Sequence, residues 1–140
     1  MFSFKWSTPV PSDAIAIRTE VFIHEQGFTA EQEHDALDEV VLHIVLYDGG
    51  SPIATGRIID DGDGTYHIGR LAVLKPRRGE GIGAVLLRHM EEKAAELGAQ
   101  TILLGAQAYA AEFYEKSGYT AYGEQYMDCH VPHINMRKKL

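Results

Sequence analysis

Two patterns of apolar residues, one alternating or continuous and one helical, divide the chain into predicted strands and helices. Short apolar stretches that are rich in β-branched side chains and bounded by turn sequences predict strands. These stretches are residues 2–6, 40–47, 52–59, 65–73, 101–104, 119–127 and 131–136. Apolar residues that recur every three to four positions predict helices, because they then share one helical face. The predicted helices are residues 12–22, 82–97 and 108–117.

The order of these elements predicts a mixed α/β or α+β sheet flanked by helices. Glycine-rich turns at 48–50 and 60–64 join three successive strands as antiparallel neighbours. The long helix that follows connects strand 65–73 to strand 101–104, a connection that is typical of parallel strands with a right-handed crossover. The sheet is therefore expected to be mostly antiparallel with one parallel pair. Because no repeat or linker interrupts the sequence, a single domain over residues 1–140 is expected.

Composition and charge exclude several classes of protein. The 140 residues include 13 basic and 20 acidic side chains, which give a net charge of −7. Such a chain is a poor candidate for nonspecific nucleic-acid binding, which requires a cationic surface. No apolar run approaches the roughly 20 residues of a membrane helix, so no membrane partner is expected. The lack of a secretory signal and the single cysteine, Cys129, fit a cytoplasmic protein.

The acidic excess lies entirely in the first part of the chain. Residues 1–56 carry nine acids against Lys5 and Arg18, whereas residues 57–140 carry eleven charges of each sign. An anionic ligand is therefore expected on the second part and a cationic ligand on the first. The acidic stretch 31–39 is interpreted either as a solvated face or as a rim that attracts an amine.

The loop between strand 65–73 and the long helix is the segment most indicative of function. It combines three glycines with basic side chains in the run Lys75, Pro76, Arg77, Arg78, Gly79, Glu80, Gly81, Ile82, Gly83 and Ala84. Amides at the start of a helix lack internal acceptors, and the helix dipole adds about half a positive charge, so a phosphate group fits there. The loop lacks the Gly-Lys-Ser/Thr ending of a nucleotide-hydrolysing loop. It meets the minimal dinucleotide fingerprint, but no acid follows the next strand.

Two motifs in this part of the chain resemble those of one superfamily. Arg78-x-x-Gly81-x-Gly83 resembles the acetyl-coenzyme A signature of the GNAT-fold N-acetyltransferases, and residues 111–119 resemble their Phe-Tyr-x-x-x-Gly-Phe/Tyr segment. The order of elements over 65–119 matches that superfamily without a gap. The remaining chain is similar to the ElaA-like and YjcF-like branch of bacterial GNAT proteins, through residues 18–26, the acids up to Asp38, and residues 131–136.

The resemblance implies a GNAT fold, in which a splayed pair of parallel strands forms a wedge for the coenzyme. It implies transfer of acetyl from acetyl-coenzyme A to a primary amine of a small molecule or peptide, by direct attack in a ternary complex. The loop would bind the pyrophosphate, and the end of strand 65–73 would pair with the pantetheine arm. The implied coenzyme-binding residues are Leu71, Ala72, Val73, Arg78, Gly79, Glu80, Gly81, Ile82, Gly83, Ala84 and Gln107. A plain helix cap is an equal interpretation of Gln107.

The resemblance also implies a general acid. Tyr114 corresponds to the superfamily's usual acid, which protonates the departing thiolate, although Tyr114 is also a candidate for packing alone. The acceptor amine must lose a proton, because an alkyl amine has a pKa of about 10.4. The sequence does not choose among the possible bases. The candidates are Glu25, Glu33, Asp35, Asp38, His43 and His133.

Other interpretations of the chain stay open. A coenzyme A-binding regulator without catalysis and an aminosugar-phosphate N-acetyltransferase are the alternatives to an amine acetyltransferase. Cys129, His130 and His133 form an incomplete ligand set, so no metal is expected. Residues 137–139 are interpreted as a solvated tail. Exposed edge strands would allow a homodimer.

Overall fold

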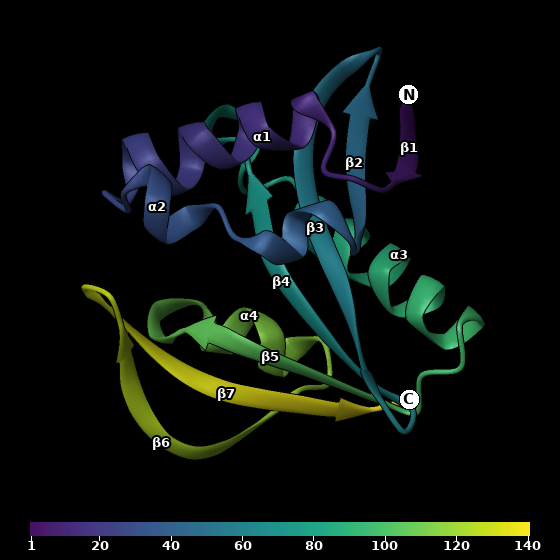
Figure 1. The fold of residues 1–140 in the computed structure, drawn as a ribbon, viewed down its shortest axis with the longest axis vertical. Coiled ribbons are helices and arrows are strands. Elements are labelled where there is room, and N and C mark those ends of the chain that lie inside the picture. The colour runs from purple at the N-terminus through teal and green to yellow at the C-terminus, as the bar shows by residue number, and fades with distance from the viewer.

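The computed structural model, which describes all 140 residues, contains one seven-stranded sheet in the order β1-β2-β3-β4-β5-β7-β6 (Figure 1). The strands are β1 Phe2–Ser7, β2 Leu42–Asp48, β3 Ser51–Gly62, β4 Thr65–Val73, β5 Thr101–Gln107, β6 Thr120–Asp128 and β7 Val131–Lys139. The helices are α1 Ser12–Arg18, its π-helical continuation Thr19–Glu25, α2 Ala30–Glu33, α3 Ile82–Glu96 and α4 Ala111–Lys116. Single 3-10 turns occur at Ala36–Glu39, Lys75–Arg77 and Ala108–Ala110. No helix is long and apolar enough to cross a membrane.

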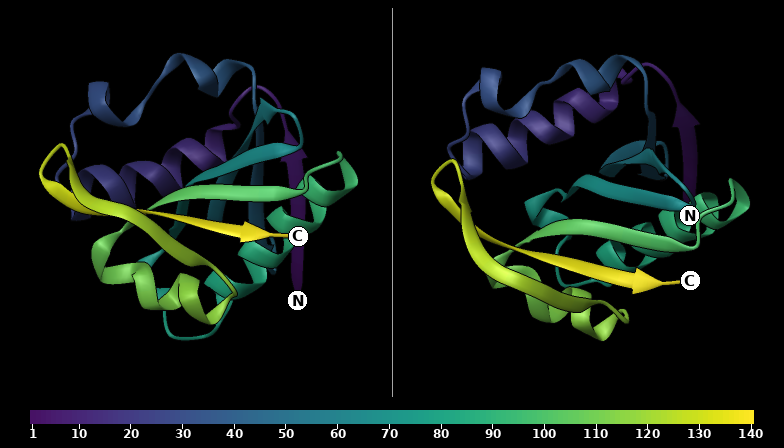
Figure 2. Two further views of the ribbon diagram at one scale, coloured as in Figure 1. Left: turned by 90° about the horizontal axis from the view of Figure 1, so that it is seen from below. Right: turned by 60° about the horizontal axis from the view of Figure 1, so that its bottom comes forward.

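Helices cover both faces of the sheet, with α1 and α2 on one face and α3 and α4 on the other (Figure 2). The alternation of side chains along β2 explains this arrangement. Ile44 and Leu46 are fully buried in the larger core with Met90 of α3, whereas Val45 packs on the opposite face with Ile17 of α1. Burying each of these large side chains contributes about 1.5–3 kcal/mol. The expected mixed sheet with flanking helices is confirmed.

The parallel pair β4–β5 positions the site. All other neighbouring strands are antiparallel, and β4 pairs with β5 only from Thr65 to His67, opposite residues 101–103. Beyond that point the two strands diverge, so the edge of β4 that faces β5 has no partner over residues 68–73. The splayed wedge implied by the resemblance is therefore present.

A bulge lies in the splayed part of β4. Thr55 pairs with Ala72 and Arg57 pairs with Gly69, so three steps along β4 match two steps along β3. The extra residue bends the strand and re-aims its side chains. At the bulge, Arg70 has a φ of +52°, a left-handed conformation that is uncommon for a residue other than glycine.

The structure corrects two interpretations of the sequence. The C-terminal residues are not a solvated tail, because β7 runs between β5 and β6 and pairs with β5 as far as Lys139. Lys138 Nζ donates to Glu91 at 3.1 Å and to the Ser117 carbonyl at 2.9 Å. The acidic stretch, for which no element was predicted, contains α2 and the 3-10 turn Ala36–Glu39.

Candidate active site

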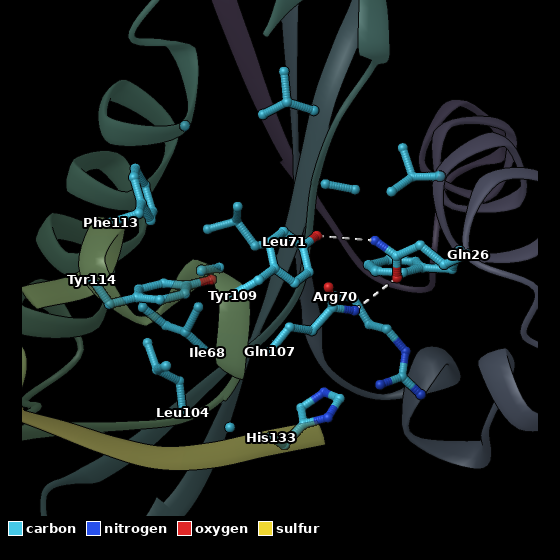
Figure 3. A pocket seen from close by; sticks show the side chains of 18 of the residues that line it. Gln26, Ile68, Arg70, Leu71, Leu104, Gln107, Tyr109, Phe113, Tyr114 and His133 are labelled. Atoms are coloured by element: carbon cyan, nitrogen blue, oxygen red, sulfur yellow. Dashed lines mark hydrogen bonds between the residues drawn. The ribbon is translucent and has the colours of Figure 1, made fainter. Parts of the chain in front are cut away.

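A cavity of about 690 Å³ opens between the splayed ends of β4 and β5 (Figure 3). This volume lies within the roughly 300–1,000 Å³ that is usual for small-molecule sites. The cavity brings together the predicted residues Glu33, Leu71, Ala72, Val73, Arg78, Gly79, Gly81, Ile82, Gly83, Ala84, Gln107, Tyr114 and His133. The predicted residues Glu25, Asp35 and Glu80 are not among those that line it.

The glycine loop presents free amides at the entrance of α3. Gly79 and Gly81 have φ values of +82° and +77°, a left-handed conformation that favours glycine. Gly81 is the N-cap of α3, and the first intrahelical bond runs from the Val85 N–H to the Gly81 carbonyl at 3.2 Å. The amides that precede this bond therefore have no acceptor within the helix. A side chain at Gly83 would place its Cβ 3.3 Å from the Phe113 ring, so glycine allows α3 to approach α4 closely.

The two arginines of the loop already have acidic partners. Arg78 donates to both carboxylate oxygens of Glu25 at 2.9 Å, and its Nε donates to the Val73 carbonyl at 3.0 Å. Arg77 donates to Asp48 at 2.8 Å and also contacts Glu80. Glu25, a candidate base from the sequence, is thus held against the loop at the end of the π-helical segment.

Tyr114 points its hydroxyl into the cavity from α4 (Figure 3). Its ring packs edge-to-face on Phe113 and Tyr119, with centroids 5.0 and 5.9 Å apart. Burial raises the pKa of Tyr114 to about 12, and the nearby Tyr109 adds to the effect. The phenol is therefore protonated throughout the physiological range and is available as a proton donor.

His133 lies on β7, buried against the other end of the cavity. Its Nδ1 lies 2.9 Å from the Val131 carbonyl, which can only accept a hydrogen bond, so Nδ1 carries the hydrogen. In the neutral ring the other nitrogen, Nε2, then has a free lone pair. Its nearest carboxylate oxygen, on Asp128, is 3.9 Å away. This ring can accept a proton at Nε2.

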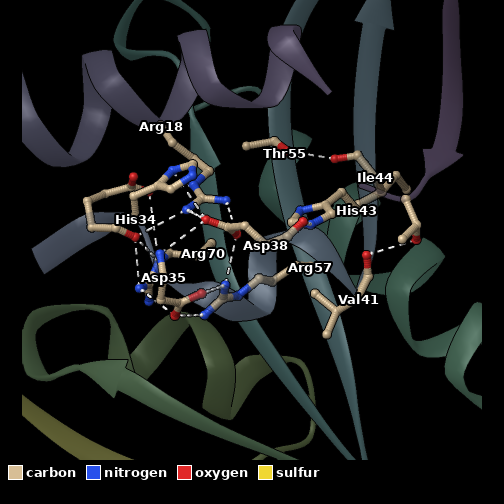
Figure 4. A network of polar contacts seen from close by, with 12 residues as sticks. Arg18, His34, Asp35, Asp38, Val41, His43, Ile44, Thr55, Arg57 and Arg70 are labelled. Atoms are coloured by element: carbon tan, nitrogen blue, oxygen red, sulfur yellow. Dashed lines mark hydrogen bonds and ion pairs between the residues drawn. The ribbon is translucent and has the colours of Figure 1, made fainter. Parts of the chain in front are cut away.

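Asp38 is the centre of a buried network and not part of a solvated rim (Figure 4). It is fully buried and accepts hydrogen bonds from Arg18 Nη1 and Nη2 at 2.8 and 2.9 Å and from Arg57 Nη1 at 2.9 Å. Arg18 also donates to Glu33, which is 7% exposed. Burial opposes the charge of Asp38, but the hydrogen bonds and charges of the arginines hold its pKa below the usual value. Neither a solvated face nor a free amine-attracting rim describes these acids.

Two further candidate bases belong to the same network. Asp35 accepts from Arg57 at 2.7 and 2.8 Å, and this contact lowers the pKa of Asp35. His43 Nε2 lies 3.1 Å from the Asp38 carbonyl, and burial lowers the pKa of His43. His43 does not line the cavity.

Several cavity residues were not predicted from the sequence. Gln26, at the end of the π-helical segment, accepts from Gln107 Nε2 at 2.7 Å and lies 3.5 Å from the Tyr109 hydroxyl. Gln107 thus ties β5 to the N-terminal helices. Arg70, at the bulge of β4, also lines the cavity. No local sequence pattern marks these residues, because their roles depend on which elements pack together.

Comparison with known proteins establishes the family. The fold and cavity define a mixed-sheet α/β protein with a pocket between two splayed parallel strands. Residues 9–140 match the family described as acetyltransferase (GNAT) domain. The chain belongs to the GNAT acetyltransferase family. Over 128 residues it is 41% identical to the uncharacterized N-acetyltransferase YjcF of Bacillus subtilis, with 90% of each chain covered.

Solved structures agree with this assignment. Escherichia coli ElaA has a TM-score of 0.87 and 27% identity over 99% of this chain and 100% of that one. An acyl-CoA N-acyltransferase from Pseudomonas aeruginosa has a TM-score of 0.86 and 27% identity, with 99% of each chain covered. These similarities confirm the predicted ElaA-like and YjcF-like branch and the predicted acyltransferase class. Within the structure, no group of three or more His, Cys, Asp or Glu side chains converges as a metal site.

Proposed function

We propose that this protein transfers the acetyl group of acetyl-coenzyme A to a primary amine of a small molecule or peptide, by direct attack in a ternary complex. The observation that carries the proposal is that a single cavity joins the free amides of the glycine loop, the open edge of β4 and the protonated hydroxyl of Tyr114. Family membership supports the acetyl transfer itself.

The residues present fit coenzyme A. Free amides at the N-terminus of α3 suit a pyrophosphate, and glycine at positions 79 and 81 keeps side chains away from it. The unpaired edge of β4 at Leu71, Ala72 and Val73 offers backbone groups to the amides of an extended pantetheine arm. Such backbone pairing needs no particular side chains, which explains the plain apolar sequence of this strand end.

The proposed chemistry uses one acid and one base. The amine nitrogen attacks the acetyl carbonyl carbon, the carbon–sulfur bond breaks, and the departing sulfur takes the proton of Tyr114. The nitrogen loses its proton to Nε2 of His133, and solvent exchange restores both groups. A backbone amide on the open edge of β4 would stabilise the developing oxyanion. Deprotonating an alkyl amine at pH 7 costs about 4.6 kcal/mol, so a base in the cavity matters.

The contacts favour His133 over the other candidate bases. Glu33, Asp35 and Asp38 are engaged by arginines, and a carboxylate held by a guanidinium is a weak proton acceptor. Glu25 is engaged by Arg78. Of the candidates, only His133 combines a place in the cavity wall with a free lone pair.

The test is a coenzyme A release assay over amino acids, peptides, polyamines and aminosugars. Replacing Tyr114 by Phe should lower kcat roughly 10–10⁴-fold while the Kd of coenzyme A changes less than twofold. Tyr122→Phe, which removes a hydroxyl on β6 outside the cavity, is the matched control. His133→Gln should lower kcat in the same range, because the variant lacks a ring nitrogen that can accept the proton.

Two results would contradict the proposal. Unchanged turnover in Tyr114→Phe would remove Tyr114 as the acid. Coenzyme A binding by calorimetry, with no amine able to stimulate release, would indicate a coenzyme-binding regulator instead of an enzyme.

A further inference from the structure

Arg70 is poorly paired compared with the two arginines beside it. The carboxylate oxygens of Asp38 and Asp35 accept close bonds from Arg18 and Arg57, at 2.7 to 2.9 Å. Arg70 Nη2 lies 3.4 Å from Asp35, and its Nε lies 3.8 Å from Glu33. Its close hydrogen bonds, from Nε and Nη2, both go to the Glu33 backbone carbonyl, at 3.1 and 3.0 Å.

The Nη1 group of Arg70 has no protein partner, and the side chain borders the cavity. Arg70 is 27% exposed, in contrast to Arg18 and Arg57, which are 1% and 5% exposed. Burial and repulsion by Arg57 and Arg18 lower the pKa of Arg70. Arg70 therefore has weaker contacts with carboxylates than Arg18 and Arg57 have.

The bulge places Arg70 on the side of the cavity that faces α2. Arg70 directly precedes the strand end 71–73 proposed to hold the pantetheine arm, and its left-handed backbone conformation turns the side chain out of the β4 alternation. In Figure 3 it points toward the N-terminal helices and away from Phe113 and Tyr114, and it lines the same cavity as His133. An amine at His133 would therefore have this guanidinium within the same cavity.

We propose that Arg70 binds a carboxylate of the acceptor, so that the acceptors are amines that also carry a carboxylate, such as amino acids. This inference rests on the proposed acetyltransferase function and names its substrate class. A guanidinium with free N–H groups matches the planar, paired oxygens of a carboxylate, and such charge-assisted bonds are strong where water is scarce.

Charge balance in the network supports an amino acid over a polyamine. The three acids Glu33, Asp35 and Asp38 are matched by three arginines, so this group carries no net negative charge to attract a second ammonium. The cavity wall instead contains a cation, Arg70, whose nearest carboxylate oxygen lies 3.4 Å away on Asp35. A zwitterionic acceptor would supply that carboxylate and present its nitrogen to His133.

The experiment compares acceptors that differ only at the carboxylate. Coenzyme A release is measured with L-amino acids and ω-amino acids, with their primary amides and with the corresponding decarboxylated amines. We expect kcat/KM for the best acid to exceed that for its amide roughly 10- to 100-fold, the range of a hydrogen-bonded charged pair. In Arg70→Gln this acid-to-amide ratio should fall to within about threefold of unity.

Variants and an inhibitor separate recognition from folding. Arg70→Lys, which keeps the charge but loses the planar fork, should show an intermediate ratio. Arg137→Gln, an exposed substitution on β7, should keep the wild-type ratio. A carboxylic acid that lacks the amine should inhibit the wild type competitively against the acceptor, whereas its amide should not. This inhibition test needs no variant, so it holds even if Arg70→Gln fails to fold.

Each outcome decides a separate question. Equal rates with acids and amides in the wild type would overturn carboxylate recognition while leaving amine acetylation intact. A ratio preserved in a folded Arg70→Gln, judged by its melting temperature, would overturn the role of Arg70. Failure of every amine, acid or amide, to release coenzyme A would overturn the proposed function and this inference with it.

Discussion

Asp38 provides a sharp test of how the N-terminal helices are attached to the sheet. Asp38→Asn keeps the size of the side chain but removes the charge that faces two buried guanidinium groups. Asp38 is fully buried and Arg18 is 1% exposed, so water cannot replace the lost partner. Breaking a buried ion pair by removing one member costs about 3–5 kcal/mol. That is a large share of the roughly 5–15 kcal/mol by which a domain is stable.

The assay is urea and thermal unfolding followed by circular dichroism. A loss of this size should lower Tm by roughly 10–20 °C, since about 1 kcal/mol shifts Tm by roughly 4 °C at this chain length. Glu31→Gln, an exposed acid in the same stretch, is the matched control and should change stability by less than about 0.5 kcal/mol. If Asp38→Asn also lost less than about 1 kcal/mol, the network would not be a major stabilising feature.

The sign of the pH dependence follows from the lowered pKa of Asp38. A carboxyl whose folded pKa lies below its unfolded value of about 3.9 contributes stability above that pH and loses it as the pH falls toward the folded pKa. Wild-type stability should therefore decline below about pH 4. Asp38→Asn should decline less steeply there. An identical acid limb in both proteins would contradict the assigned pKa shift.

Two further predictions concern the cavity. Glu25→Gln should tighten coenzyme A binding about two- to fivefold by calorimetry, because it frees Arg78 from an exposed ion pair worth up to about 1 kcal/mol. Unchanged or weaker binding would contradict the idea that Glu25 competes with the coenzyme for Arg78. Because burial raises the pKa of Tyr114 to about 12, the acid stays protonated and kcat should show no alkaline decline up to pH 10. A descending limb below about pH 10 that vanishes in Tyr114→Phe would contradict this assignment.

The sequence alone predicted the class of fold and the glycine loop that lines one end of the cavity. Glycines at 79, 81 and 83 next to a predicted helix start indicate an anion site by purely local physics, and the structure has left-handed backbone at the first two. The change from alternating to helical periodicity after residue 73 correctly predicted the crossover. The glycine loop and the crossover helix are determined by residues that are close together in the chain, so both can be predicted from the sequence.

Only the tertiary structure decided the other end of the cavity, where the acceptor is proposed to bind. Asp38 pairs with arginines 20 and 19 positions away, and Arg70 contacts the Glu33 carbonyl 37 positions away. Sequence charge counts therefore suggested a solvated acidic face or an amine-attracting rim, whereas helix packing buries Glu33 and Asp38 against guanidinium groups. The bulge that aims Arg70 arises from the pairing of β3 with β4 while β5 diverges, a relation between strands that no local pattern specifies.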